Sequence, residues 1–224
     1  MRVAAAIPAY EAAPSVGDVV ARTRRHLAEV LVVDDGSRDG TGAAALAAGA
    51  RVLTHPENRG KGAALRTAFE DLFARGCEAV VTLDADGQHL PEQIPRLLDA
   101  AAGGAQLVLG TRDHRFAAMN SVRRASNTLS SWAISVLAGE RFRDVQTGFR
   151  LYRRDLVEAL GFPETGFEAE SAIVVRAARR GFALAVVPIE LGFADGRCTS
   201  HYRPVADSLR IAGAVIRARL EAAR

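Results

Sequence analysis

Short apolar runs that alternate with helix-forming segments constrain the fold of this chain more than any other feature. Residues 2–8, 30–33, 79–83 and 106–109 are mostly apolar, and amphipathic or alanine-rich segments separate them. Continuous apolar strands are typical of a parallel sheet that helices cover on both faces. The sequence therefore predicts an α/β fold with a mostly parallel central sheet flanked by helices.

The same alternation extends along the whole chain. We expect strands over 2–8, 30–33, 51–54, 79–83, 106–109, 149–152 and 184–187, and helices over 15–28, 41–48, 62–74, 91–102, 120–137, 166–180 and 204–223. Ser15 is expected to cap the first helix, and Pro91 suits the first turn of another. No repeat or low-complexity linker interrupts the pattern, so we expect one domain over residues 1–224.

Composition excludes several classes of protein. Hydrophobic residues make up 49% and charged residues 25% of the chain, which is ordinary for a globular protein. No run approaches the ~18 apolar residues of a membrane span, and the N-terminus lacks the pattern of a secretory signal. Cys77 and Cys198 form neither a disulfide framework nor a usual zinc site, so a reducing, cytoplasmic location is expected. The low aromatic content of 6% argues against a nucleic-acid partner.

Acidic residues follow two of the predicted strands directly. Asp34 and Asp35 come after the second apolar run, and Asp84 and Asp86 come after the fourth. Ligands of parallel α/β sheets bind outside the carboxyl ends of the strands, so we expect these acids to meet at one crevice. A hard cation such as Mg²⁺ takes carboxylate oxygens together with substrate phosphates. The pattern favours a metal–phosphate site, whereas an isolated Asp-x-Asp would indicate only a solvated turn.

A basic loop flanked by glycines leads into the predicted helix over 62–74. Residues 58–62 read Asn-Arg-Gly-Lys-Gly, and Lys61 is the only lysine of the chain. Helix N-termini favour anions, and glycine lets backbone amides approach them closely. The loop is not a Walker A motif, because the GxxxxGK[ST] pattern is absent. It indicates a second contact with an anionic ligand, with an ordinary capped turn as the alternative.

Together these segments resemble the family 2 glycosyltransferases, which have the GT-A fold. The matching stretches are 7–11, 32–41, 58–62, 84–89, 110–112 and 144–150, and the resemblance covers residues 1 to about 190. The stretch 144–150, Asp-Val-Gln-Thr-Gly-Phe-Arg, is most similar to polyprenyl-phosphate hexosyltransferases, which include dolichyl-phosphate mannose and glucose synthases. The resemblance implies a nucleotide-sugar-binding half over 1–110, an acceptor half over 111–203 and a C-terminal amphipathic helix over 204–224.

The resemblance also implies roles for residues around the donor. The positions matched to the pocket for base and ribose are Pro8, Tyr10, Glu11 and Asp35, of which Asp35 hydrogen-bonds the base. The positions matched to a Mg²⁺ or Mn²⁺ site are Asp84, Asp86 and Gln88. Lys61 stands where a cation holds the loop near the donor. The positions matched to a mobile loop that closes over the diphosphate are Arg197, Ser200, His201 and Arg203.

A second group of matched residues concerns the acceptor and the reaction centre. Arg112 and Arg123 look like arginines that grip an acceptor phosphate, which suits the planar guanidinium fork. The positions matched to the reaction centre are Asp144, Gln146 and Thr147, while Glu168 and Glu170 fall in an acidic segment of unsettled role. The chain departs from the pattern at Asn127, where many relatives carry serine, and at His201, where lipid-phosphate relatives often carry lysine.

The expected function is thus an inverting, metal-dependent transfer of a hexose from a UDP- or GDP-sugar, with a polyprenyl phosphate as the preferred acceptor. A hydroxyl acceptor, for which Asp144 would be the general base, and a non-catalytic nucleotide-sugar-binding protein stay open as alternatives. A nucleotidyltransferase is disfavoured, because residues 1–20 lack its glycine-rich basic signature. The terminal helix suits either an anionic membrane surface or packing on the sheet or on a second copy of the chain, with packing preferred.

Overall fold

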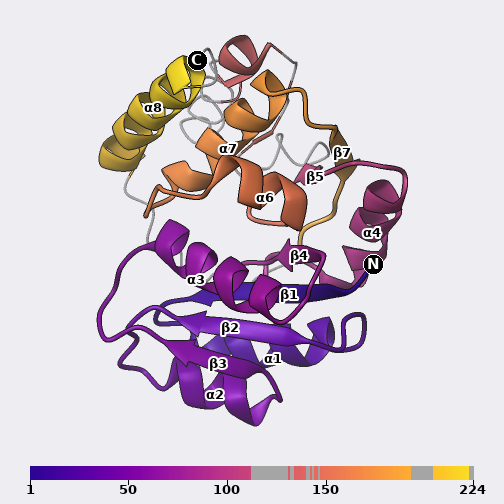
Figure 1. Cartoon of the computed structure of the whole chain (residues 1–224). Coiled ribbons are helices and arrows are strands. Elements are labelled where there is room, and N and C mark those ends of the chain that lie inside the picture. Colours follow the sequence, from indigo (N-terminus) through magenta and orange to yellow (C-terminus); the bar gives the residue numbers. More distant parts are fainter. Residues whose placement is uncertain are drawn as a thin grey trace.

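The chain is described by a computed structural model that covers residues 1–111, 131, 134–139, 142, 144–145, 147–192 and 204–221, with side chains from residue 210 onward in the last range. Seven strands form one sheet in the order β3-β2-β1-β4-β6-β5-β7 (Figure 1). Their bounds are β1 Val3–Ala9, β2 Val30–Asp34, β3 Arg51–Thr54, β4 Ala79–Thr82, β5 Leu107–Thr111, β6 Arg150–Arg153 and β7 Leu184–Pro188. All neighbouring pairs are parallel except those of β6, which runs antiparallel to β4 and β5. The predicted mostly parallel sheet is confirmed.

Helices cover both faces of this sheet, as the apolar strands predicted. Their bounds are α1 Ala13–Thr23, α2 Thr41–Ala47, α3 Lys61–Ala74, α4 Ile94–Ala102 after the 3-10 turn η1 Pro91–Gln93, α6 Arg154–Leu160, α7 Glu168–Arg179 and α8 Pro204–Glu221. Successive residues of β1 enter opposite cores: Ala4 and Ala6 pack with α3 and α7, while Ala5 and Ile7 pack with α1 and α4. The central strands β1, β2, β4, β5 and β6 are therefore buried on both sides, whereas the edge strands β3 and β7 are partly exposed.

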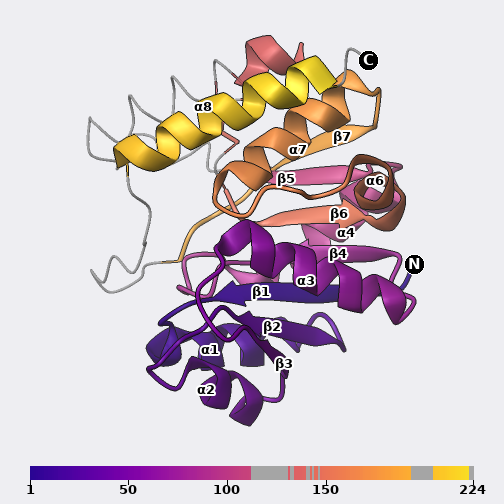
Figure 2. The ribbon, with the colours of Figure 1, turned by 60° about the vertical axis from the view of Figure 1, so that its left-hand side comes forward.

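The helix α8 lies along α7 in both ribbon views (Figure 2). Its inward side chains, Ile211, Ala214, Val215 and Ala218, are buried in the core that α3 and α7 share. This agrees with the expectation that the terminal helix packs on the protein, although Ile216 and Leu220 stay 51% and 64% exposed. Within the described ranges, none of the helices combines the length and apolarity needed to cross a bilayer.

Three local predictions need correction. The helix α6 was not predicted, because seven residues are too few to show a clear helical period. The first helix was predicted over 15–28 but spans Ala13–Thr23, with Pro14 in its first turn. Ser15 does not cap it, because its hydroxyl donates to the carbonyl oxygen of Ala85 at 2.7 Å. Of the helix predicted over 120–137, residues 131 and 134–137 are described, and all of these are helical.

The register brings three strand ends to one edge of the sheet. Ala9 at the end of β1 pairs with Asp34 at the end of β2, and Ala6 pairs with Thr82 at the end of β4. The segments that follow β1, β2 and β4 therefore leave the sheet on the same side. This is the edge at which parallel α/β sheets bind ligands.

Candidate functional site

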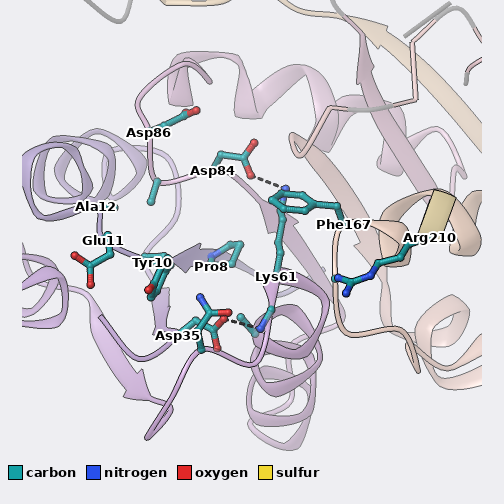
Figure 3. A pocket seen from close by; sticks show the side chains of 16 residues that line it. Pro8, Tyr10, Glu11, Ala12, Asp35, Lys61, Asp84, Asp86, Phe167 and Arg210 are labelled. Carbon is teal, nitrogen blue, oxygen red and sulfur yellow. Dashed lines mark hydrogen bonds and ion pairs between the residues drawn. The ribbon is translucent and has the colours of Figure 1, made fainter. Parts of the chain in front are cut away.

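A pocket of about 540 Å³ lies at the carboxyl ends of β1, β2 and β4 (Figure 3). Its lining residues are Pro8, Ala9, Tyr10, Glu11, Ala12, Asp35, Asn58, Gly60, Lys61, Ala64, Asp84, Ala85, Asp86, Gly166, Phe167 and Arg210. Four segments that the sequence matched to a donor site thus meet in one cavity. The volume falls in the range of about 300–1,000 Å³ that is common for small-molecule sites.

The pocket wall after β1 is fixed by the loop after β2. Glu11 has a positive φ of 50°, a backbone conformation that is uncommon for a residue with a side chain. Its amide donates to Ser37 Oγ at 2.9 Å, and its carboxylate accepts from the amide of Arg38 at 2.8 Å. The amide of Ala12 donates to Thr41 Oγ1 at 2.8 Å. These bonds hold Glu11 and its neighbour Tyr10 at the pocket. The sequence of residues 10–12 alone does not indicate this placement.

Asp35 is the most constrained acid of the pocket. Its side chain is buried and accepts hydrogen bonds from the backbone amides of Arg59 at 2.9 Å and Gly60 at 2.8 Å. Nδ1 of His55 lies 2.6 Å from Oδ1 of Asp35, and Nε2 of the same ring lies 3.0 Å from Thr67 Oγ1. Asp35 therefore fixes the basic loop, and two of the loop amides that were expected to face an anion already donate to this carboxylate.

The glycines of the basic loop allow a close approach to the segment before α7. A Cβ at Gly60, where φ is +95°, would clash with the carbonyl oxygen of Thr165, and a Cβ at Gly62 would lie 2.5 Å from the carbonyl oxygen of Glu164. The amide of Ala63 donates to the carbonyl oxygen of Thr165 at 3.0 Å. These glycines thus have a packing reason that the sequence did not reveal.

Lys61 forms an ion-paired centre at the side of the pocket. Its Nζ lies 2.7 Å from Asp84 Oδ1 and 2.8 Å from Glu170 Oε2. Burial by itself lowers the pKa of Lys61, but the charges of the two carboxylates outweigh it and raise this pKa above its ordinary value. Gly148 leaves room for the pair, because a Cβ there would lie 2.5 Å from Asp84 Oδ1 and 2.7 Å from Lys61 Nζ.

Asp84 and Asp86 stand on the turn after β4, as predicted. Burial, and then the neighbouring charge of Asp84, raise the pKa of Asp86. Two hard oxygen ligands that repel each other in a pocket suit Mg²⁺ or Mn²⁺, which would relieve the repulsion. In the part of the chain that the structure describes, no three His, Cys, Asp or Glu side chains are arranged to hold a metal. The backbone amide of Gln88, the third predicted ligand, donates to Asp86 Oδ1 at 3.0 Å. Gln88 is not among the residues that line the pocket.

The motif over 144–150 is held together by a buried arginine. The guanidinium of Arg150 donates to the carbonyl oxygen of Thr147 at 2.8 Å, to that of Val145 at 2.6 Å and to that of Glu170. Arg150 and Asp144 are both 0% exposed. Asp144, which was matched to the reaction centre, does not line the pocket. Seven other predicted site residues lie outside the described residues: Arg112, Arg123, Gln146, Arg197, Ser200, His201 and Arg203.

Two of the large lining side chains were not predicted. Phe167 places its ring 6.0 Å from Lys61 Nζ, and Arg210 of α8 reaches the pocket from the side opposite Glu11 (Figure 3). In the sequence, Arg210 is only one residue of the terminal amphipathic helix. Helical periodicity separates the polar side of α8 from its apolar side, but it does not indicate that Arg210 reaches a pocket formed mostly by residues 8–86.

Comparisons with known proteins give the fold and the family. The chain superposes on glucosyl-3-phosphoglycerate synthase from Mycobacterium tuberculosis, solved with Mn²⁺, UDP and phosphoglyceric acid, with a TM-score of 0.75 at 22% identity, covering 98% of this chain and 78% of that one. The likeness confirms the GT-A fold.

Two curated relatives are more similar in sequence. Glycosyltransferase AglJ of Haloferax volcanii is 35% identical over 184 residues, which are 81% of this chain and 60% of that protein. Undecaprenyl-phosphate mannosyltransferase of Micrococcus luteus is 36% identical over 204 residues, which are 84% of this chain and 83% of that protein. Residues 5–161 match the family described as glycosyl transferase family 2. With the pocket at the predicted strand ends, these matches show that the chain belongs to the family 2 glycosyltransferases.

Proposed function

We propose that this glycosyltransferase moves a hexose from a UDP- or GDP-sugar to a polyprenyl phosphate with the help of Mg²⁺ or Mn²⁺. The observation that carries the proposal is the pocket in which the buried Asp35, the ion-paired Lys61 and the pair Asp84 and Asp86 meet. The name of the Micrococcus luteus relative supports a polyprenyl-phosphate acceptor. The ligands of the Mycobacterium tuberculosis structure support a nucleoside diphosphate and a divalent metal.

Base and ribose would bind at the end of the pocket formed by Pro8, Tyr10, Glu11 and Asp35. The carboxylate of Asp35 can accept a hydrogen bond from a ring N–H of either uracil or guanine. Its hydrogen bonds to His55, Arg59 and Gly60 hold it in one orientation before the donor arrives. A preorganised acceptor of this kind lowers the entropic cost of binding.

The donor diphosphate would lie between the turn after β4 and Arg210. Asp84 and Asp86 are the residues that would hold the metal, with Gln88 as the third ligand by resemblance. The metal would supply positive charge against the charge that develops on the leaving diphosphate. Arg210 lines the same pocket and offers a guanidinium whose fork matches phosphate oxygens.

The acceptor phosphate would attack the anomeric carbon from the face opposite the leaving diphosphate, so the configuration inverts. A phosphate monoester has a second pKa of about 6 and is largely dianionic at neutral pH, so it needs no general base. A hydroxyl acceptor would need one. The burial of Asp144 away from the pocket lining favours the phosphate acceptor. The predicted phosphate contacts of Arg112 and Arg123 are part of this proposal.

A two-stage experiment tests the function. In the first stage, UDP and GDP are compared by thermal shift with and without Mn²⁺, and one nucleotide is expected to stabilise the fold in a metal-dependent way. A ligand at about 100 times its Kd adds about 2.7 kcal/mol. In the second stage, the matching sugar donor and a polyprenyl phosphate should give a glycolipid. Absence of any nucleotide shift contradicts the proposal, and a shift without product supports the non-catalytic alternative.

The variant Asp144→Asn separates the two acceptor classes. With a polyprenyl phosphate we expect a modest loss of rate, because the residue would only position its neighbours. With a hydroxyl acceptor the loss would be about 10²–10⁴-fold, the usual contribution of a general base. A near-total loss with the lipid phosphate would contradict the base-free transfer.

A lipid acceptor implies contact with the inner face of the membrane. The exposed Ile216 and Leu220 of α8, next to Arg217, are the described residues that suit such a peripheral contact. Sedimentation with anionic vesicles tests it. Failure of the protein to pellet would sink the membrane contact while leaving the transfer reaction to be judged by its product.

A further inference from the structure

The ammonium of Lys61 forms an ion pair with Asp84, a carboxylate that the proposed function assigns to a metal. Nζ lies 2.7 Å from Asp84 Oδ1 and 2.8 Å from Glu170 Oε2, so it bridges the two acids. The side chain of Asp84 is 32% exposed, whereas those of Lys61 and Glu170 are 14% and 8% exposed. Asp84 is therefore the most exposed member of this trio, and it lines the pocket together with Lys61 (Figure 3).

The position of this ammonium is fixed from several sides. Glu170 holds it from α7, and the ring of Phe167 lies 6.0 Å from it. The backbone of Gly148 passes so close that an added Cβ would lie 2.7 Å from Nζ. The flat, branched guanidinium of an arginine needs more room than a compact ammonium. This geometry gives a reason for the only lysine in a chain that otherwise uses arginine.

The charges around the turn after β4 differ before and after a diphosphate arrives. Without it, a divalent ion would meet one acid that is not paired to Lys61, namely Asp86, and would lie close to the positive charge of the ammonium. Like charges a few ångströms apart repel strongly in a partly buried site. A nucleoside diphosphate brings further negative oxygens, which favour the ion and can also attract Lys61.

We propose that Lys61 acts as a built-in counter-cation of Asp84, so that the metal enters the site together with the donor diphosphate and not alone. Asp84 then exchanges its contact with the ammonium for one with the metal when the donor binds, while Glu170 keeps Lys61 in place. This inference rests on the proposed function. It assigns to Lys61 a positioning role in the order of binding, distinct from contact with the sugar.

The binding of Mn²⁺ to the full chain without nucleotide tests this role, measured from the signal of free Mn²⁺ in electron paramagnetic resonance. The informative variant is the double change Lys61→Met with Glu170→Gln, which removes the ammonium from Asp84 and does not leave the buried Glu170 as a carboxylate that has lost this partner. We expect the affinity of this variant for Mn²⁺ to be about tenfold higher than that of the wild type, because the ammonium no longer competes with the ion for Asp84. A tenfold change lies within the usual range of coupling energies between sites. Adding Asp84→Asn should abolish the gain.

Two control variants separate this effect from general damage. Glu170→Gln alone keeps Lys61 and should give no gain. Arg51→Met breaks the ion pair of Arg51 with Asp71, outside the pocket, and should also give none. Circular dichroism and thermal melting check that each variant folds. A double variant that folds but binds Mn²⁺ no better than the wild type overturns the inference, as does tight binding of Mn²⁺ by the wild type without nucleotide.

The same titration with UDP or GDP present distinguishes this inference from the proposed function. Wild-type protein is expected to bind Mn²⁺ at least tenfold more tightly with the correct nucleotide than without it. If neither nucleotide binds, the proposed function fails. The nucleotide-free comparison of the double variant with the wild type still decides whether Lys61 opposes a cation at Asp84.

Discussion

His55 and Asp35 form a buried hydrogen bond beneath the pocket, with Nδ1 of the ring 2.6 Å from Oδ1 of the carboxylate. A carboxylate can only accept, so Nδ1 carries a proton, and Nε2 of the same ring lies 3.0 Å from Thr67 Oγ1. The ring thus links the end of β3 to α3 through Thr67, and to the residue after β2 through Asp35, the acid that the proposed function assigns to the base. His55 was not among the residues that the sequence singled out.

The variant His55→Leu should therefore weaken both the fold and the donor site. Loss of a hydrogen bond to a buried carboxylate costs about 1–3 kcal/mol, which denaturant unfolding measures. Because, among the described residues, only the amides of Arg59 and Gly60 then hold the carboxylate of Asp35, we expect affinity for the correct nucleotide to fall about tenfold, measured by calorimetry. His26→Leu is the control. His26 is a half-buried residue after α1, and its replacement should leave the nucleotide affinity unchanged. Unaltered affinity in His55→Leu would argue against the role of Asp35 in base binding.

A second prediction concerns Arg150 and its contribution to the stability of the fold around the motif over 144–150. Its guanidinium donates to three backbone carbonyl oxygens inside the core, so Arg150→Met leaves all three without this donor. We expect a loss of about 3 kcal/mol or more in the free energy of unfolding, since each buried unpaired group costs about 1–3 kcal/mol. Arg75→Met removes only a half-exposed pair with Asp71 on α3 and should cost less than about 0.5 kcal/mol. Similar losses in the two variants would contradict this account of Arg150.

The strand ends were predictable because their signal is local. Each apolar run is buried on both faces, and Asp35, Asp84 and Asp86 follow their strands directly, so periodicity and the rule for parallel sheets placed them together. The resemblance added Tyr10 and Glu11. Their placement depends on hydrogen bonds that the amides of Glu11 and Ala12 donate to Ser37 and Thr41, and no local sequence pattern indicates these bonds.

What escaped the sequence depends on contacts between distant segments. The strand β6 lies between β4 and β5 and runs antiparallel to both, and four residues of sequence specify neither this position nor this direction. The glycines at 60 and 62 were attributed to anion binding, but they face the carbonyl oxygens of residues 164–165. Arg210 reaches the pocket only because α8 packs along α7. Long-range packing of this kind leaves no periodic signal.

A surface ion pair predicts a weak acid dependence of stability. Arg22 of α1 donates to Glu92 of η1, and this hydrogen bond lowers the pKa of Glu92 to about 2. A lowered pKa in the folded state means that the stabilisation is present above the unfolded value of about 4.3 and is lost as the pH falls towards 2. Glu92 is 47% exposed, so the effect should stay below about 1 kcal/mol.

Glu92→Gln should accordingly flatten the fall in unfolding free energy between about pH 5 and pH 2, measured by urea denaturation. The exposed Glu70→Gln on α3 is the matched change and should preserve the wild-type slope. If both variants keep the same slope, the Arg22 pair does not contribute to acid stability.

Arg210 offers the sharpest test of where the donor phosphates lie. It lines the pocket across from Glu11, and in the proposed function its guanidinium faces the diphosphate (Figure 3). Arg210→Ala should lower the affinity for UDP or GDP about tenfold, since a charge-assisted hydrogen bond contributes about 1.5–3 kcal/mol. The affinity for the corresponding nucleoside, which has no phosphate, should not change.

The control for Arg210 lies on the same helix. Arg217 is exposed two turns further along α8 and does not line the pocket, so Arg217→Ala should leave both affinities unchanged. Arg210→Lys keeps the charge but loses the fork, and we expect it to recover part of the loss. Equal losses of affinity for the nucleoside and the nucleoside diphosphate in Arg210→Ala would mean that the residue supports the shape of the pocket. The loss of a phosphate contact cannot weaken the binding of a ligand that has no phosphate.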